Sequence, residues 1–273
     1  MNSAPDETPG AGSTDGDDAS ADASSRKAPR SRGLRVLWWI LGSIGALIVA
    51  AVVAFLVWAN VGVMAAEPTA LAAVESDPAV TLTDGGSAWV LAPAEGGSDT
   101  GLVFIPGAKV EADAYAATLV GAVQDGATVV ITKPTLNLAF FDLRPLSDFT
   151  ALAPDVMTWA VGGHSLGGVR ACQLAEDADA LVLFASYCAN DLSGSDLPVL
   201  SIAGSEDGLS TPEKIAESAP LLPADTEFVE IDGGNHAGFG AYGPQAGDNP
   251  ATISDEQIRA DITAALAPFL LAL

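Results

Sequence analysis

The chain has 273 residues, of which 35 are Asp or Glu and 11 are Lys or Arg, so its formal net charge is −24 at pH 7. This excess of negative charge disfavours nucleic acid as a partner and repels strongly anionic ligands at long range. We see no internal repeat, and the length beyond the N-terminal segments described next suits one globular domain with a single core.

The first 35 residues predict a tail outside the folded domain. Residues 1–25 are rich in Asp, Glu, Ser, Gly and Pro and hold almost no bulky apolar side chains, which predicts disorder. A basic cluster follows, formed by Arg26, Lys27, Arg30, Arg32 and Arg35.

An uncharged run follows the basic cluster, from Val36 to Ala66. Its dense apolar part, residues 36–59, is long enough to cross a hydrocarbon core of about 30 Å and predicts a transmembrane helix. Because the basic residues precede this run, the positive-inside rule places the tail in the cytoplasm and the rest of the chain outside a cell membrane. The alternative is a cleaved signal peptide, since Val63-Met64-Ala65 is an acceptable cleavage context.

Residues 60–79 are predicted to be a linker, and residues 80–273 alternate between strand-like and helix-like patterns. Short apolar runs predict strands at about 80–84, 87–92, 101–105, 128–132, 158–162, 180–186, 198–203 and 226–231. Apolar residues at helical spacing predict helices at 111–124, 166–175, 211–219 and 254–271.

This alternation favours an α/β fold, with a mainly parallel sheet covered by helices on both faces. Gly85-Gly86 is typical of a tight turn, which predicts an antiparallel hairpin at one edge of the sheet. Ser254 with Gln257 resembles a capping box at the start of the last helix.

The strand predicted at 158–162 runs into Gly163-His164-Ser165-Leu166-Gly167, the pattern G-x-S-x-G. Between a strand and a helix this pattern forms a sharp turn that points the serine hydroxyl outward, and the glycines avoid clashes that a Cβ atom would cause. Ser165 is therefore the candidate nucleophile. A glycine-rich turn without chemistry is the alternative.

A serine nucleophile needs a base, and the chain has only two histidines. His164 lies inside the turn itself, so the base must be His236. His236 lies in the Gly-rich segment 233–240, after a predicted strand. On such a loop one imidazole nitrogen can reach the serine while the other faces an orienting carboxylate.

The orienting carboxylate is predicted directly after the strand at 198–203, where two acidic residues stand together. We choose Asp207, because Gly208 permits a sharp reversal of the chain and Asp is the more usual partner for fixing a histidine tautomer. Glu206 is the alternative.

The order Ser165, Asp207, His236 places each group beyond the carboxyl end of a predicted strand, where open α/β sheets build their sites. Here the chain resembles the α/β-hydrolase superfamily, in particular the small-core serine hydrolases related to dienelactone hydrolases and simple esterases. The resemblance covers roughly residues 80–272. It implies the roles of nucleophile, orienting acid and base for these three residues.

A tetrahedral intermediate also needs an oxyanion hole made of backbone N–H groups. Leu166, directly after the candidate nucleophile, supplies the first donor by its position. The second is expected in the turn that begins at Pro106, which has no N–H, so Ala108 or Lys109 must donate. The superfamily often has His-Gly where this chain has Pro106-Gly107.

The connection between the strands predicted at 180–186 and 198–203 is short. Many lipases of the superfamily insert a helical cap there, so we expect an open site. The segment 134–154 is the candidate apolar wall for a substrate, and the alternative is that its side chains belong to the core. The apolar side chains concerned are Phe140, Phe141, Leu146 and Phe149.

Cys172 and Cys188 are the only cysteines. An oxidising space favours a bridge between them. Because Cys172 lies two helical turns below Ser165, however, their Cα atoms can exceed the limit of about 7 Å for a disulfide, and both states stay open. The sequence has no metal-ligand cluster, so we expect neither a metal nor a cofactor.

These observations predict a membrane-anchored serine hydrolase that cleaves a neutral carboxylic ester or thioester through an acyl-enzyme on Ser165. Its expected partners are a small ester-like molecule and the membrane. Two alternatives stay open: a catalytically inactive binding protein with the same fold, and an acyltransferase or peptidase that acts on the cell envelope.

Overall fold

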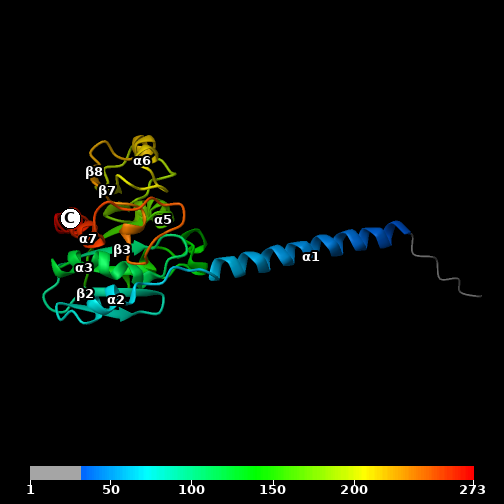
Figure 1. Cartoon of the computed structure of the whole chain (residues 1–273), viewed down its shortest axis with the longest axis horizontal. Coiled ribbons are helices and arrows are strands. Elements are labelled where there is room, and N and C mark those ends of the chain that lie inside the picture. The colour runs from blue at the N-terminus through cyan, green and yellow to red at the C-terminus, as the bar shows by residue number, and fades with distance from the viewer. Residues whose placement is uncertain (1–31) are drawn as a thin grey trace, which may run out of the picture. The chain divides into compact units, whose positions relative to one another are not determined.

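The computed structural model describes residues 32–273 (Figure 1). By its internal contacts the chain divides after Ala50, and residues Ala51–Leu273 form the larger compact unit. The predictions for residues 1–31, which include the disordered segment and the basic residues Arg26, Lys27 and Arg30, lie outside the described residues.

One helix, α1 (Arg32–Asn60), contains the predicted transmembrane run. It is long and apolar enough to cross a membrane. Its 29 residues correspond to about 44 Å at a rise of about 1.5 Å per residue. Its described part includes Arg32 and Arg35, which precede the predicted run at Val36.

The segment 60–79, predicted as a linker, is partly folded onto the domain. It contains α2 (Pro68–Glu75), whose Val74 is buried in the hydrophobic core. Met64 also forms a parallel bridge with Val110. Alanine and leucine in this segment favour a helix, and burial of one side of that helix makes it part of the domain.

Eight strands form one sheet in the spatial order β1-β2-β4-β3-β5-β6-β7-β8. β2 pairs antiparallel with β1 and with β4, and every other pair is parallel. This confirms the mainly parallel sheet with a hairpin at one edge. The strands are β1 (Val80–Asp84), β2 (Ala88–Pro93), β3 (Thr100–Ile105), β4 (Thr128–Thr132), β5 (Thr158–His164), β6 (Ala180–Phe184), β7 (Val199–Gly204) and β8 (Glu227–Ile231).

Helices connect most of the strands. The α-helices after β1 are α3 (Ala116–Gln124), α4 (Ser147–Thr150), α5 (Leu166–Leu174), α6 (Pro212–Ser218) and α7 (Asp255–Leu271). The short 3-10 helices are η1 (Ala112–Tyr115), η2 (Thr135–Asn137), η3 (Ala139–Phe141), η4 (Ala175–Asp177), η5 (Ala219–Leu221) and η6 (Ala237–Phe239). The helix predicted at 111–124 is thus divided between η1 and α3.

Half of the predicted capping box forms at the start of α7. The hydroxyl of Ser254 accepts the backbone N–H of Gln257 at 3.2 Å. The Gln257 side chain does not reach back, because its amide donates to Asp261 at 2.8 Å.

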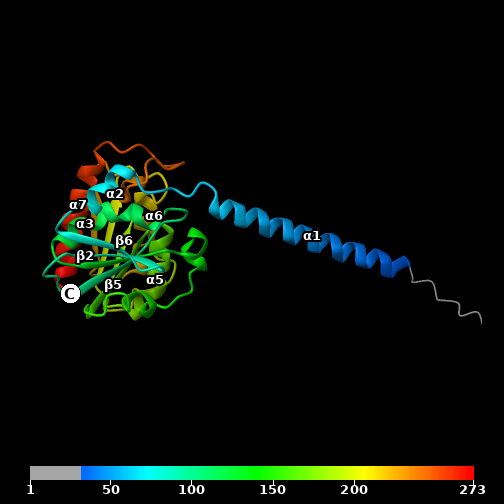
Figure 2. The ribbon, with the colours of Figure 1, turned by 90° about the horizontal axis from the view of Figure 1, so that it is seen from below.

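The hydrophobic core lies on both faces of the sheet. Along β3, Leu102 and Phe104 belong to one buried cluster, while Val103 and Ile105 belong to the other. The first cluster includes residues of α2, α3 and α7, and the second includes residues of α4 and α5. Figure 2 shows α3 and α5 on opposite sides of the strands. Burial on both faces explains why the central strands are continuous apolar runs.

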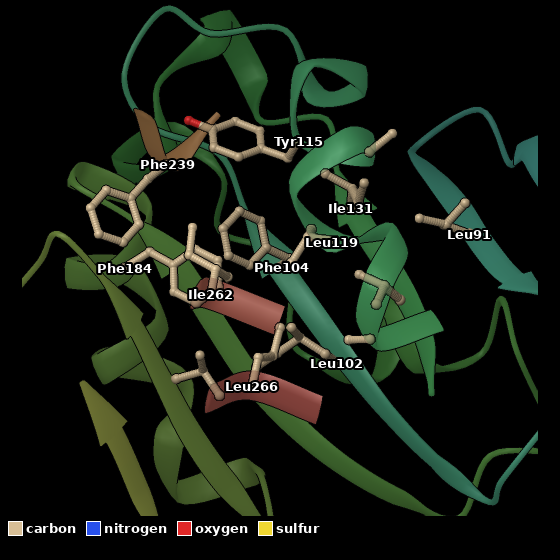
Figure 3. Packing of buried hydrophobic residues seen from close by; sticks show 14 of the residues in the cluster. Leu91, Leu102, Phe104, Tyr115, Leu119, Ile131, Phe184, Phe239, Ile262 and Leu266 are labelled. Carbon is tan, nitrogen blue, oxygen red and sulfur yellow. The ribbon is translucent and has the colours of Figure 1, made fainter. Parts of the chain in front are cut away.

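Aromatic side chains fill the first cluster near the carboxyl ends of the strands (Figure 3). The ring centroid of Phe104 lies 5.1 Å from that of Tyr115 and 5.1 Å from that of Phe184. Phe239, on η6 after β8, lies 5.8 Å from Phe184. These rings support the turns that follow the strands.

Cys172, in α5, and Cys188, after β6, form a disulfide with Cα atoms 5.6 Å apart. The two turns of helix between Ser165 and Cys172 do not separate the cysteines, because the chain after β6 returns along α5. Asn190 donates its side-chain N–H to the carbonyl of Cys172 at 3.0 Å, and the Ser186 hydroxyl donates to the carbonyl of Ser165 at 2.6 Å.

Two segments were expected to shape the site, the connection between β6 and β7 and the segment 134–154. Residues 185–198 form neither a helix nor a strand, so the predicted absence of a helical cap is confirmed there. In the segment 134–154, Leu146 and Phe149 are buried in the core, whereas Phe140 and Phe141 are half exposed. Of these four side chains, only Phe140 and Phe141 are exposed at the surface.

Candidate active site

Ser165 forms the turn between β5 and α5, with φ 52° and ψ −121°. A positive φ is costly for a residue with a Cβ and is the strained conformation expected of a nucleophile turn. Close packing holds the turn: a Cβ on Gly167 would lie 2.0 Å from the carbonyl oxygen of Ile105, and one on Gly163 would lie 2.5 Å from the Gly167 backbone. The glycines of the motif are therefore required by contact.

Asp207 and His236 meet at the carboxyl ends of β7 and β8. Nδ1 of His236 lies 2.8 Å from Oδ2 of Asp207, and both residues are buried. The other carboxylate oxygen accepts the N–H groups of Leu209 and Ser210, each at 2.7 Å. An ionised carboxylate can only accept, so the imidazole proton lies on Nδ1 and Nε2 is left as an acceptor.

Glu206, the alternative acid, forms no hydrogen bond or ion pair with His236. The backbone N–H of Glu206 donates to the carbonyl of Gly234 at 2.8 Å, and Glu206 is partly exposed. The geometry therefore favours Asp207 as the carboxylate that orients the imidazole.

Nε2 of His236 is buried and has no hydrogen-bond partner within residues 32–273, so it makes no hydrogen bond with Ser165. The His236 ring centroid lies 4.4 Å from that of His164, the residue directly before Ser165. The predicted residues thus gather at the carboxyl ends of the strands. The hydrogen bond between Asp207 and His236 is formed, and the one between His236 and Ser165 is not. Such hydrogen bonds are often long or poorly aligned before substrate binds.

Two of the three predicted oxyanion donors are free to act. Leu166 provides the first N–H of α5, which has no acceptor within its own helix. The Ala108 N–H has no partner in the described part of the chain, whereas the Lys109 N–H donates to the carbonyl of Asn137 at 2.8 Å. Because the Lys109 N–H is already engaged, the geometry favours Ala108 over Lys109 as the candidate second donor.

A buried tyrosine that sequence reasoning missed links the oxyanion turn to the nucleophile turn. The Tyr115 hydroxyl accepts the N–H of Gly107 at 3.0 Å and lies 2.9 Å from Nδ1 of His164. In sequence, Tyr115 is one apolar residue among several at helical spacing, which indicates only a place in the core.

Both partners in this link are electrically neutral. Burial raises the pKa of Tyr115, although the hydrogen bond from Gly107 acts in the opposite direction. Burial also lowers the pKa of His164 well below its ordinary value, and the neighbouring His236 lowers it further. The hydrogen bond between the Tyr115 hydroxyl and Nδ1 of His164 therefore joins two uncharged groups.

Asp248 joins the acid loop to the histidine loop and was also missed. One of its carboxylate oxygens accepts the N–H of Gly208 at 3.0 Å, and the other accepts the N–H of Ala237 at 2.9 Å. In sequence, the segment 247–250 indicates only a turn. The contact holds the two loops that carry Asp207 and His236 against each other.

Within residues 32–273, no group of three or more His, Cys, Asp or Glu side chains is placed to hold a metal ion.

Comparison with known proteins identifies the family. A search of curated proteins found no match. A model of the alpha/beta hydrolase family matches residues 101–260, which include the serine turn, the acid loop and the histidine loop. Since this match spans more than half of the chain, the protein belongs to the alpha/beta hydrolase family.

Proposed function

We propose that the protein is a serine hydrolase that cleaves a carboxylic ester or thioester through an acyl-enzyme on Ser165. The observation that carries this proposal is the buried Asp207–His236 pair. Its Nε2 is free, and its imidazole ring centroid lies 4.4 Å from that of His164, the residue directly before Ser165. A hydrogen-bonded carboxylate–imidazole pair beside a serine turn is the arrangement that activates a serine hydroxyl.

In the first half of the reaction, His236 takes the hydroxyl proton as Ser165 attacks the carbonyl carbon. The same imidazole then gives that proton to the leaving alcohol or thiol, and the acyl group stays on the serine. Water repeats these steps in the second half and releases the acid. The N–H groups of Leu166 and Ala108 stabilise the negative oxygen of each tetrahedral intermediate.

The proposal includes a membrane anchor, with α1 as the transmembrane helix, the N-terminus in the cytoplasm and the hydrolase domain outside the cell membrane. The disulfide between Cys172 and Cys188 supports this orientation, because disulfides persist in oxidising spaces. The basic residues before the apolar run support it as well.

Charge and fold limit the substrate class. Residues after Arg35 include 29 acidic and 6 basic side chains. A neutral ester suits this balance better than an anionic one. The narrower resemblance to dienelactone hydrolases and simple esterases stays a prediction.

A fluorophosphonate probe tests the proposal, because it reacts only with an activated serine. We expect the full chain in detergent or vesicles to be labelled and the Ser165→Ala variant not to be labelled. Ser193→Ala, in an exposed turn, is the matched control and should keep the label. An unlabelled wild-type chain would favour the inactive binding protein, and a label that persists in Ser165→Ala would contradict the assigned nucleophile.

Tyr115→Phe should lower kcat for a short-chain ester by about 10- to 100-fold, less than the roughly 10²- to 10³-fold loss on deleting an oxyanion donor. The substitution removes the bond that positions the Gly107 turn against His164, while KM should change little because no substrate contact is lost. Steady-state kinetics measure both parameters.

Tyr242→Phe is the matched control, since Tyr242 is also buried beside His164 but its hydroxyl donates to Gln245 and not to a residue of the serine turn. We expect its kcat to stay within about threefold of wild type, as is usual for substitutions outside the reacting groups. An equal loss in both variants, or an unchanged kcat in Tyr115→Phe, would show that Tyr115 only supports the core.

A further inference from the structure

The end of α1 contacts the short helix η3. The ring centroid of Phe55 lies 5.5 Å from that of Phe141. The carbonyl of Ala59 accepts a hydrogen bond from the Asn137 side chain at 3.5 Å, and Ala59 is fully buried. These contacts lie within the compact unit Ala51–Leu273.

The same region borders the oxyanion turn. The ammonium of Lys109 lies 4.8 Å from the ring centroid of Trp58. The N–H of Lys109 donates to the carbonyl of Asn137, just before η3. Lys109 follows Ala108, the candidate oxyanion donor, and η3 packs against α5, which begins with Leu166. The turn that carries Ala108 therefore adjoins this part of the surface, and α5 packs beside it.

Large apolar side chains are exposed here, and we call them the apolar rim. They are Trp58, Val61, Phe140, Phe141 and Leu143. Chain neighbours and the contacts just described join them into one surface. Large apolar patches on a soluble domain mark surfaces that meet a membrane or another molecule.

Basic side chains lie beside the apolar rim in an otherwise acidic domain. Three of the six Lys and Arg residues after Arg35 lie on or next to it: Lys109, Arg144 and Arg170. Arg144 pairs with Asp142. Within residues 32–273, Lys109 and Arg170 belong to no ion pair. Aromatic and basic side chains together are typical of protein surfaces at lipid headgroups.

We propose that the apolar rim rests on the outer leaflet of the bilayer and that the site takes a lipid-soluble ester whose long acyl chain stays in that leaflet. This inference rests on the proposed function, because Phe55 and Trp58 lie inside the predicted span 36–59. Phe141 contacts Phe55 and therefore lies at the depth where the chain leaves the bilayer. An ester headgroup at this level reaches the oxyanion turn without leaving the membrane surface.

The position of the rim can be measured without any activity. An environment-sensitive nitrobenzoxadiazole label on Leu143→Cys, in the full chain reconstituted in phosphatidylcholine–phosphatidylglycerol vesicles, should shift its emission to the blue and be quenched by nitroxide-labelled lipid. The matched control is Met157→Cys. Met157 is 75% exposed, Leu143 is 82% exposed, and Met157 precedes β5 at the opposite end of the sheet from Ser165.

The label at position 157 should stay in water and escape lipid quenching. Equal quenching at both positions, or none at position 143, would overturn the proposal. Protection of position 143 from an aqueous quencher without quenching by nitroxide lipid would overturn it too, because a protein partner would then cover the rim.

Substrate choice gives a second measurement. For the double variant Phe140→Ser/Leu143→Ser, the ratio of turnover of p-nitrophenyl palmitate in vesicles to turnover of soluble p-nitrophenyl acetate should fall about tenfold, as expected for two apolar side chains removed from the lipid surface. Met157→Ser/Phe228→Ser removes two equally exposed apolar side chains elsewhere and should keep the wild-type ratio.

An unchanged ratio in the rim variant, or an equal fall in the control variant, would contradict the proposal. If the wild-type chain hydrolyses neither ester, the proposed function fails. The lipid quenching at position 143 still decides whether the rim meets the bilayer, so the two failures are distinguishable.

Discussion

Ser165→Ala should lower kcat for ester hydrolysis by a factor on the order of 10⁶, the loss seen when the nucleophile of a serine hydrolase is removed. The acyl-enzyme cannot form without the hydroxyl, and the remaining oxyanion donors and imidazole give only residual catalysis. The measurement is turnover of p-nitrophenyl acetate by the purified full chain.

The fold should survive this substitution. Alanine keeps the Cβ, so the strain of the positive φ at residue 165 is unchanged. The Ser165 carbonyl still accepts from Ser186. We expect the free energy of unfolding to change by no more than about 0.5 kcal/mol, which thermal unfolding can check. An active variant, or one that loses activity only by unfolding, would contradict the chemical role of the hydroxyl.

Asp207→Asn should lower kcat by about 10⁴-fold, the loss seen when the orienting acid of a serine triad becomes an amide. The Asp207 carboxylate accepts a hydrogen bond from Nδ1–H of His236, whereas an asparagine can offer an N–H there and stabilise the other tautomer. Nε2 would then carry a proton and could not take one from Ser165. Steady-state kinetics on the same ester measure the loss.

Glu206→Gln is the matched control, because Glu206 is the neighbouring acid and forms no hydrogen bond or ion pair with the imidazole. We expect kcat within about threefold of wild type, as for a surface substitution away from the reacting groups. A large loss in Glu206→Gln together with a small loss in Asp207→Asn would transfer the orienting role to Glu206 and refute the geometric assignment.

Much of the fold was predictable because its signals are local. Continuous apolar runs mark strands that are buried on both faces, and helical spacing marks the helices between them. The turn at Ser165 was predictable for the same reason, since Gly163 and Gly167 are needed within one strand-to-helix connection. With two histidines in the chain, the choice of His236 followed by elimination.

The features of the site that the sequence did not reveal are contacts between segments far apart in the chain. The engagement of the Lys109 N–H depends on the carbonyl of Asn137, which no local pattern reveals. The link from Tyr115 to His164 and the clamp by Asp248 each join different loops. The closeness of Cys172 and Cys188 depends likewise on the return of the chain along α5.

The sequence by itself predicted the order of the eight strands, the apolar helix within Arg32–Asn60, the serine turn after β5 and the histidine after β8. The spacing of apolar residues and the placement of glycines are properties of short segments, and the number of histidines is a simple count. All three can therefore be read without coordinates. Only the tertiary structure decided which acid meets His236, which N–H groups stay free and which aromatic residues stay exposed. Those outcomes depend on packing and hydrogen bonds between distant segments, and each group in such a contact is satisfied or left free only once the whole domain has folded.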